Sequence, residues 1–424
     1  MKKNVKYIIL YIIIAIICFS EIIPFLNGVI SYIIFSLSTL IISYYVAKNN
    51  IIFFSLSKFL LIFSFLFIII IPLIGDKETE SLEKRPLAEF PTWRWRNVWK
   101  FFFEYQAYFE DRFAFRNEIL DAHGTLKYDV FGFSALTNKV KEGKDEWLFH
   151  ADMTLITPVS KPFTKKELQQ FHYNLEIITK WLNQHGVKYY LTIPPITHTI
   201  YPEKLPDYLK IVLNFSRMDQ LNSYLKKHSS VNFIGYKSEL TVAKKYRQLY
   251  YDNDTHWNPY GAFIGYTKII NTLSKDFNQI VPNELEDYEE RWVNNHNPGD
   301  LLMLLGKKPL IGSVLLFRKD SVEAVFQKKI GNIEEWKMPI PVNDLKLFVI
   351  RDSYSEQLKR FLSTNFKQSF YFWQEEIPIE KIREEKPDLV LHEMSERLIA
   401  HYLKLPPEIK NDTAFTNQFN IEDF

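Results

Sequence analysis

Short apolar runs alternate with amphipathic stretches from residue 140 toward the end of the chain. The apolar runs have the length of buried strands, and the stretches between them repeat apolar residues every three or four positions, as helices do. Strands that alternate with helices usually form βαβ units, in which helices cover a largely parallel sheet. The sequence therefore predicts an α/β domain, with strands at 187–193, 231–234, 345–350 and 388–391 and helices at 164–184, 215–227, 259–273 and 354–365.

Two polar motifs lie at the ends of these predicted elements. Asp254 and His256 immediately precede a predicted helix, and Ser353 follows the strand at 345–350 and opens the next helix. Open α/β sheets place their functional groups at the carboxyl ends of strands. Asp254 could hold the His256 imidazole in one tautomer, and His256 could then accept the hydroxyl proton of Ser353. The two motifs together predict a Ser-His-Asp triad for acyl chemistry on an ester.

Each motif by itself has a simpler explanation. Ser353 or Asp352 could be a helix N-cap, and Asp254 with His256 could be a pair of metal ligands or a surface pair. A metal site would need further ligands that the sequence does not offer nearby, so no metal is expected. The first amides of the helix that Ser353 opens could stabilise an oxyanion. Three neighbouring side chains are candidates for contacts to the oxyanion or the substrate: Tyr354, Arg351 and Trp257.

The first 75 residues are almost wholly apolar and predict transmembrane helices. The third candidate is at the short limit of the roughly 20 residues that cross a bilayer, so two spans are the alternative to three. A cleaved signal peptide is disfavoured, because no small-residue cleavage site follows the first apolar run. The candidate spans are residues 7–26, 28–47 and 59–75.

The lysines near these spans predict their orientation. Lysines precede the first span, Lys48 and Lys58 lie between the second and third spans, and the turn between the first two spans has no Lys or Arg. Cytoplasmic loops carry an excess of Lys and Arg, so an odd number of spans places the chain after Gly75 outside the cytoplasm. We therefore expect a multi-pass membrane protein with an extracytoplasmic globular part.

Composition limits the partners of that globular part. The formal net charge is +2, which argues against nucleic acid as a partner. The only cysteine, Cys18, lies in the first candidate span, so the globular part has no disulfide and no thiolate nucleophile. We expect three regions: transmembrane helices at 1–75, a joining region at 76–139, and a catalytic domain at 140–424. The joining region contains a predicted aromatic helix, 99–108, which packs on the domain, rests at the membrane interface or contacts polysaccharide.

A series of ordered motifs between about Arg85 and Glu396 resembles the alginate O-acetyltransferase family, whose catalytic domains are similar to SGNH (GDSL-type) hydrolases. The sequence departs from the family pattern at Thr197 and His198, where many relatives have a lysine. His198 is interpreted as a loop histidine, and Asp300 as a structural turn or cap residue or a residue that lines the cleft. The motifs that carry the resemblance are residues 110–116, 143–149, 200–203, 254–258, 298–301 with 305–306, 351–354 and 386–390.

The resemblance implies a three-layer SGNH-hydrolase-like fold and assigns roles to the motif residues. Ser353 would be the nucleophile, His256 the base and Asp254 its orienting partner. The expected protein is an O-acetyltransferase that acts on a cell-envelope polysaccharide or exopolysaccharide without a cofactor. A membrane-bound O-acyltransferase would supply the acetyl group from across the membrane. A carbohydrate esterase with the same triad and a non-catalytic glycan-binding envelope protein are the alternatives.

Overall fold

In the computed structural model the chain divides into two compact units, residues 1–126 and 127–424, and each is described by itself. The described residues are 87–93, 98–112, 116, 139–151, 162–207, 217–229, 231, 233–294, 298–305, 312–373, 376–401 and 404–423. The predicted transmembrane helices at 1–75 lie outside these residues. Within the described ranges, no helix is both long and apolar enough to cross a membrane.

The described part of the first unit is a helix with an extended segment along it. Helix α4, Val98–Arg112, contains the aromatic helix that the sequence predicts. The Phe90 ring meets Tyr108 edge to face at 5.2 Å between centroids. The amide of Ala88 donates to Asp111 at 2.8 Å, and Arg112 donates to the Ala88 carbonyl at 2.8 Å. These contacts fix the extended segment against α4. The prediction that α4 meets a membrane or a polysaccharide stays a prediction.

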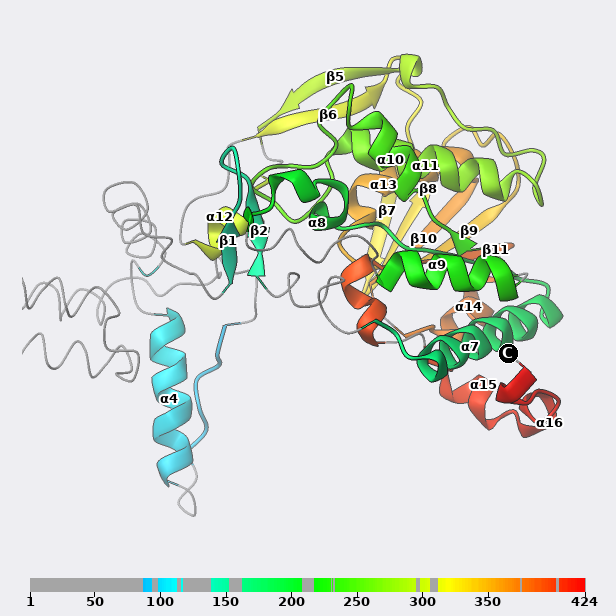
Figure 1. Ribbon diagram of the computed structural model, residues 1–424, viewed down its shortest axis with the longest axis horizontal. Helices are drawn as coiled ribbons and strands as arrows, with labels where there is room; N and C mark the ends of the chain where they lie inside the picture. The colour runs from blue at the N-terminus through cyan, green and yellow to red at the C-terminus, as the bar shows by residue number, and fades with distance from the viewer. Residues whose placement is uncertain are drawn as a thin grey trace, which may run out of the picture. The chain divides into compact units, whose positions relative to one another are not determined.

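A seven-stranded mixed sheet forms the centre of the second unit, in the order β4-β3-β11-β9-β10-β8-β7 (Figure 1). The first five strands in this order are parallel, whereas β8 runs antiparallel to β10 and β7. The strands are β3 (Lys188–Thr192), β4 (Phe233–Ile234), β7 (Val325–Ile330), β8 (Ile333–Lys337), β9 (Lys346–Arg351), β10 (Gln368–Trp373) and β11 (Leu389–Glu393).

Two small antiparallel sheets and a set of helices complete this unit. The small sheets pair β1 (Val140–Glu142) with β2 (Leu148–His150) and β5 (Tyr288–Val293) with β6 (Ser313–Arg318). The α-helices are α7 (Lys165–Gln184), α8 (Thr197–Ile200), α9 (Arg217–His228), α10 (Lys237–Ala243), α11 (Pro259–Leu273), α12 (Asp300–Leu304), α13 (Ser355–Leu362), α14 (Ile379–Glu385), α15 (Pro407–Asn411) and α16 (Thr413–Thr416). The 3-10 helices are η3 (Pro202–Lys204), η5 (Leu285–Asp287), η6 (Ser363–Asn365), η7 (Glu396–His401) and η8 (Ile421–Asp423).

Alternate side chains of the central strand β9 separate two hydrophobic cores. Leu347 and Val349 pack in a core that includes residues of α11 and α13. Phe348 and Ile350 pack in the opposite core, which includes residues of α7 and α14. Figure 1 shows these helix pairs on opposite sides of the sheet. Burial of each large apolar side chain contributes about 1.5–3 kcal/mol, so both cores are needed for stability. The domain therefore has the three layers that the family resemblance implies.

Capping residues fix where helices α7 and α11 begin. Helix α7 starts with a capping box between Thr164 and Glu167. Helix α11 starts with Asn258 as N-cap, whose side chain accepts hydrogen bonds from the amides of Tyr260 and Gly261, and Pro259 occupies the first turn. The loop that carries His256 is therefore anchored at the start of a buried helix.

The antiparallel strands of the sheet are the main difference from the sequence prediction. The sequence indicates a largely parallel sheet, and it does not predict β7, β8 or β10. All six side chains of β7 are exposed. Its sequence, Val-Phe-Gln-Lys-Lys-Ile, does not alternate apolar and polar residues, so it lacks the pattern by which a strand is recognised. The pairing of β7 with β8 is decided by their adjacency in the chain and by their backbone hydrogen bonds.

Gly261 is a position at which the packing of α11 tolerates no side chain. A Cβ there would lie 2.3 Å from the Leu249 carbonyl oxygen and 2.9 Å from the Cβ of Trp257. We expect Gly261→Ala to lower the free energy of unfolding by about 1–3 kcal/mol, because backbone atoms must move to accept it. Chemical denaturation of the full chain measures this loss. Gly235→Ala is the control, since its nearest neighbour is the Phe233 ring at 3.3 Å, and an equal loss for both variants would contradict the prediction.

Candidate active site

The two polar motifs meet at the carboxyl edge of the sheet. Ser353 follows the end of β9 by two residues, and His256 lies in the loop before α11. The Nε2 atom of His256 is 2.7 Å from the Oγ of Ser353. Two backbone contacts hold the histidine loop. One is a β-bridge between Tyr250 and Trp257, and the other is a hydrogen bond of 2.9 Å from the Asn258 amide to the Leu249 carbonyl. The fold thus brings together two side chains that are 97 residues apart in the sequence.

Asp254 fixes the orientation of the imidazole. Its Oδ1 lies 2.6 Å from His256 Nδ1 and also accepts the His256 amide at 3.0 Å. Its Oδ2 accepts the amides of Gly299 at 2.7 Å and Asp300 at 3.0 Å. With the Nδ1 proton donated to Asp254, Nε2 is the nitrogen left to accept the proton of Ser353. The arrangement can therefore move a proton from the serine hydroxyl to the imidazole.

The electrostatics of the pair favour the charged forms of both partners. Burial opposes ionisation of Asp254, but the charge and hydrogen bond of His256, with the amides of Asp300 and Gly299, hold the pKa of this carboxyl well below its ordinary value. Burial also opposes protonation of His256, but the charge and hydrogen bond of Asp254 raise the pKa of the imidazole above its ordinary value. The imidazolium that would form after proton transfer is therefore stabilised in place.

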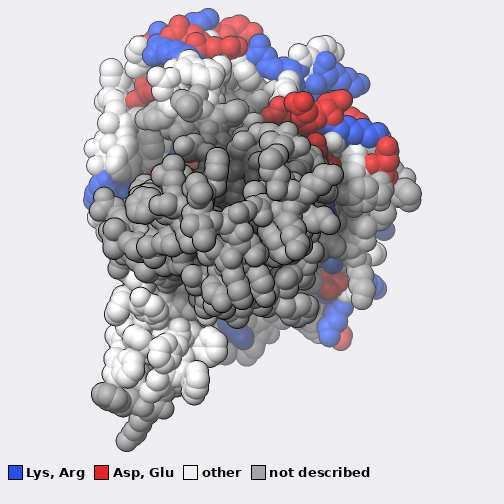
Figure 2. Space-filling view, turned by 90° about the vertical axis from the view of Figure 1, so that its left-hand side faces the viewer, with Lys and Arg blue, Asp and Glu red and all other residues white. Residues whose placement is uncertain are grey.

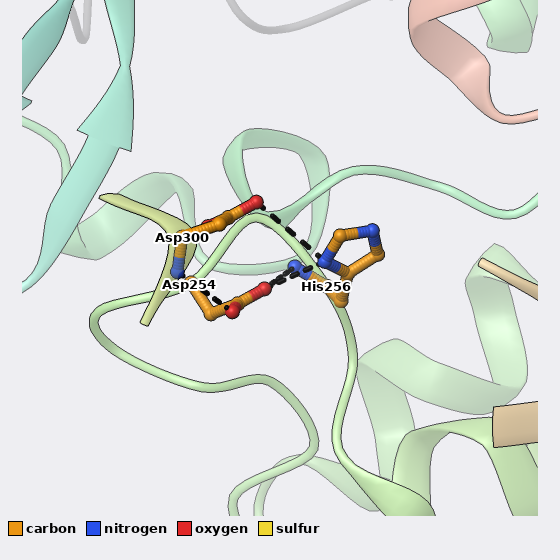
Figure 3. Close-up of side chains that lie close together, drawn as sticks. All are labelled: Asp254, His256 and Asp300. Carbon is orange, nitrogen blue, oxygen red and sulfur yellow. Dashed lines mark hydrogen bonds and ion pairs between the residues drawn. The ribbon is translucent and has the colours of Figure 1, made fainter. Parts of the chain in front are cut away.

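Asp300 is a functional candidate whose contacts the sequence interpretation missed. It is the first residue of α12, and its carboxylate accepts the Thr255 amide at 2.8 Å and the Thr255 hydroxyl. Its Oδ2 lies 3.7 Å from His256 Nδ1, so two carboxylates flank the same edge of the imidazole (Figure 3). Asp300 reaches across to the histidine loop and does not cap its own helix. Its only signal in the sequence is the Pro-Gly-Asp turn at 298–300.

Asp254, His256 and Asp300 are also the group among the described residues that could hold a metal ion. One potential ligand atom from each lies within 4.8 Å of the others. However, Asp254 Oδ1 already accepts from His256 Nδ1, and Asp300 is occupied by Thr255. A metal would have to displace these hydrogen bonds. The donor set therefore fits an oriented base better than a cation site.

Three predicted oxyanion or substrate contacts, Trp257, Tyr354 and Arg351, have buried side chains in the structure, and their roles in the site stay a prediction. Trp257 is fully buried and donates to the Tyr354 carbonyl at 3.0 Å. The hydroxyl of Tyr354 donates to the Thr255 carbonyl at 2.6 Å, and its amide donates to Asp352 at 2.8 Å. Arg351 is buried between Glu334, at 3.1 Å, and Glu356, at 2.6 Å. These side chains support the two motifs from behind, and the Tyr354 amide is not free to bind an oxyanion.

His198 is buried on the short helix α8 and does not lie in an exposed loop. Its ring meets Phe149 at 4.9 Å between centroids. Burial lowers the pKa of His198 to about 3, so the imidazole is neutral at physiological pH. Its neighbour Thr197 donates to the Thr255 carbonyl at 3.4 Å. The structure therefore gives His198 a packing role and gives Thr197 a contact with the histidine loop.

Charges of both signs are interspersed on the face drawn in Figure 2. Among the described residues of that face, Lys and Arg lie beside Asp and Glu, and no broad area has a single sign. This distribution agrees with the small formal net charge of the sequence.

The fold and the site define an SGNH-like α/β domain with a serine and a histidine at the carboxyl edge of its sheet. The model of the SGNH hydrolase-like domain of acetyltransferase AlgX matches residues 140–376, which is more than half of the chain. The chain belongs to this acetyltransferase family. The family resemblance and the enzyme class predicted from the sequence are thereby confirmed.

Several solved structures match part of the chain. PatB1 of Bacillus cereus is 17% identical, with 63% of this chain and 98% of that chain covered and a TM-score of 0.48. The O-acetyltransferase domain of Pseudomonas putida AlgJ is 19% identical, with 66% and 99% covered and a TM-score of 0.43. Pseudomonas aeruginosa AlgX is 15% identical, with 65% and 64% covered and a TM-score of 0.41. No curated protein sequence matches the chain significantly. The family assignment rests on the match to the AlgX domain.

The raised pKa of His256 is directly measurable. The imidazole should titrate above the ordinary range of histidine, because the Asp254 carboxylate stabilises its charged form. Asp254→Asn removes that charge and should lower the pKa of His256. Histidine NMR of the labelled full chain follows the titration, with the resonance assigned by its loss in His256→Gln. Asp320→Asn, which removes an exposed partner of Arg318, should leave it unchanged. An unaltered His256 pKa in Asp254→Asn would contradict the assigned pair.

Proposed function

We propose that this protein transfers acetyl groups to hydroxyls of an extracytoplasmic polysaccharide through an acetyl-Ser353 intermediate. The observation that carries the proposal is the 2.7 Å contact between Ser353 Oγ and His256 Nε2, with Asp254 at 2.6 Å on the other ring nitrogen. This is the arrangement of a serine activated by a positioned base. It occurs here in a member of an acetyltransferase family.

The first half of the reaction loads the enzyme. Ser353 Oγ attacks the carbonyl carbon of the acetyl donor while His256 Nε2 takes the hydroxyl proton. The bond between the acetyl carbon and the donor oxygen then breaks, and His256 returns the proton to the leaving alcohol. Asp254 stays ionised and stabilises the imidazolium between these two proton transfers.

In the second half of the reaction, the acetyl group passes from Ser353 to the acceptor. A sugar hydroxyl gives its proton to His256 and attacks the acetyl carbon of Ser353, and the Ser353 oxygen leaves with the proton that His256 returns. Water could attack in the same way, which would make the protein an esterase. About a quarter of the His256 side chain is exposed, so the exclusion of water depends on the bound acceptor. The family assignment to acetyltransferases supports transfer over hydrolysis.

We further propose an arrangement of the whole chain around the membrane. Residues 1–75 would anchor the protein in the membrane, and residues 140–424 would form the catalytic domain outside the cytoplasm. Residues 76–139 would join the anchor to this domain. The positions of the lysines in the first 58 residues support this orientation. Acetyl-CoA is cytoplasmic, so a separate membrane-bound O-acyltransferase would pass the acetyl group across the membrane. The spans would then serve as the anchor and as the docking surface for that partner.

Acetyl transfer can be tested with the full-length protein in detergent. With 4-nitrophenyl acetate as donor and a panel of glycan oligomers, mass spectrometry should find acetylated sugar in excess of free acetate for at least one acceptor. Ser353→Ala should reduce donor turnover by about a thousandfold or more, because it removes the hydroxyl that His256 Nε2 contacts. Ser238→Ala, at an exposed serine of α10, is the matched control. Free acetate as the sole product with every acceptor would favour the esterase.

The orientation predicts which end of the chain an added protease can reach. In spheroplasts of cells that express the full chain with a different epitope tag at each end, the protease should remove the C-terminal tag and spare the N-terminal tag. Positive loops stay in the cytoplasm, so the outcome follows from the lysine distribution. Lysed spheroplasts, in which both tags are lost, provide the control. Full protection of the C-terminal tag would overturn the proposed location.

A further inference from the structure

Glu393 is a buried acidic residue that the proposed reaction does not use. It is the last residue of β11, the strand that pairs with β9, and only 2% of its surface is exposed. Its Oε2 accepts the Asp352 amide at 3.1 Å and the Ser355 hydroxyl at 2.7 Å. Its Oε1 has no hydrogen-bond partner among the described residues. A buried carboxyl with this environment requires an explanation, since an unsatisfied buried charge is costly.

The partners of Glu393 are the residues that flank Ser353. Asp352 immediately precedes the serine, and Ser355 follows it by two positions. The Asp352 carboxylate completes a brace, because it accepts the Tyr354 amide at 2.8 Å and the Ser395 amide at 3.1 Å. Residues 352, 354 and 355 are therefore all tied into one network that returns to the end of β11. Ser353 lies within this braced turn and presents its hydroxyl to His256.

Two buried carboxyls in one network cannot both be charged at low cost. Burial raises the pKa of Glu393 well above its ordinary value, and the neighbouring charge of Asp352 raises it further. These effects favour the neutral form of Glu393. A neutral carboxyl can accept from Asp352 and Ser355 without placing a second negative charge behind the nucleophile. Glutamine has the same shape and is also neutral, so it should be able to replace Glu393.

We propose that Glu393 is a positioning residue for the nucleophile: its buried carboxyl holds Asp352 and Ser355 so that Ser353 Oγ stays aligned with His256 Nε2. This inference rests on the proposed role of Ser353. Glu393 touches neither the donor nor the acceptor and acts only through the turn that carries the serine. Loss of the brace should therefore slow the attack by Ser353 and leave substrate binding nearly unchanged.

The test compares Glu393→Ala and Glu393→Gln in the full-length protein. The readouts are kcat and KM for 4-nitrophenyl acetate, and the rate at which phenylmethylsulfonyl fluoride modifies Ser353, followed by intact mass. Glu393→Ala should lower kcat and the modification rate by about 10–100-fold, because small displacements of a nucleophile are costly, while KM changes by less than about threefold. Glu393→Gln should stay within about threefold of the wild type on all three measures.

Glu396 provides a matched control for general destabilisation. It is also a buried carboxyl, but it accepts the Ile196 amide at 3.0 Å and the Thr199 hydroxyl at 2.6 Å, and neither belongs to the serine turn. Glu396→Ala should lower the melting temperature without slowing the modification of Ser353. An equal slowing by Glu396→Ala and Glu393→Ala would overturn the specific role of Glu393.

Three other outcomes are decisive. A wild-type modification rate in a folded Glu393→Ala variant would refute positioning by Glu393. A Glu393→Gln variant as slow as Glu393→Ala would show that the carboxyl must be charged, which contradicts the neutral brace. Retention of ester turnover by Ser353→Ala would instead remove the proposed function itself, so the two failures are distinguishable.

Discussion

The Asp254 carboxylate is the interaction on which the geometry of the site depends. It is buried and accepts four N–H groups: the ring and amide of His256 and the amides of Gly299 and Asp300. These bonds outweigh the cost of burying the charge and keep the carboxylate ionised. One side chain thus joins the histidine loop to the start of α12 and sets the direction of the imidazole. Without it, His256 would be free to rotate away from Ser353.

The strand order places the remaining groups behind that pair. Because β11 lies between β3 and β9, its carboxyl end is next to both the serine turn and the segment that follows β3. Glu393 braces the serine turn on one side, and Glu396 ties the loop after β11 to Ile196 and Thr199 on the other. Both carboxyls have pKa values raised by burial. Burial therefore disfavours the charged forms of these two carboxyls behind the acetyl-transfer site that we propose.

The sequence by itself determined the repeating βα pattern and the main residues of the candidate site. The periodicity of 164–184 is a local signal, and helices α7 and α11 form where the sequence predicts them. The parallel strands other than β10 were also predicted from local signals, because buried strands are short apolar runs. Asp254, His256 and Ser353 were recognisable because their residue types and their places beside predicted helices suit one chemistry. The proposed membrane anchor likewise follows from composition alone.

Only the tertiary structure decided which polar groups meet. Asp300 contacts Thr255 from 45 positions away, and Glu393 contacts Asp352 from 41 positions away. The burial of Arg351 behind the serine turn is likewise set by Glu334 on β8, a strand with no clear sequence signal. Local patterns report the propensity of a segment, whereas contacts of this kind depend on strand order and on loops that meet at one edge of the sheet. Local signals in the sequence therefore specify helices and strands, whereas the fold determines which polar groups surround the candidate site.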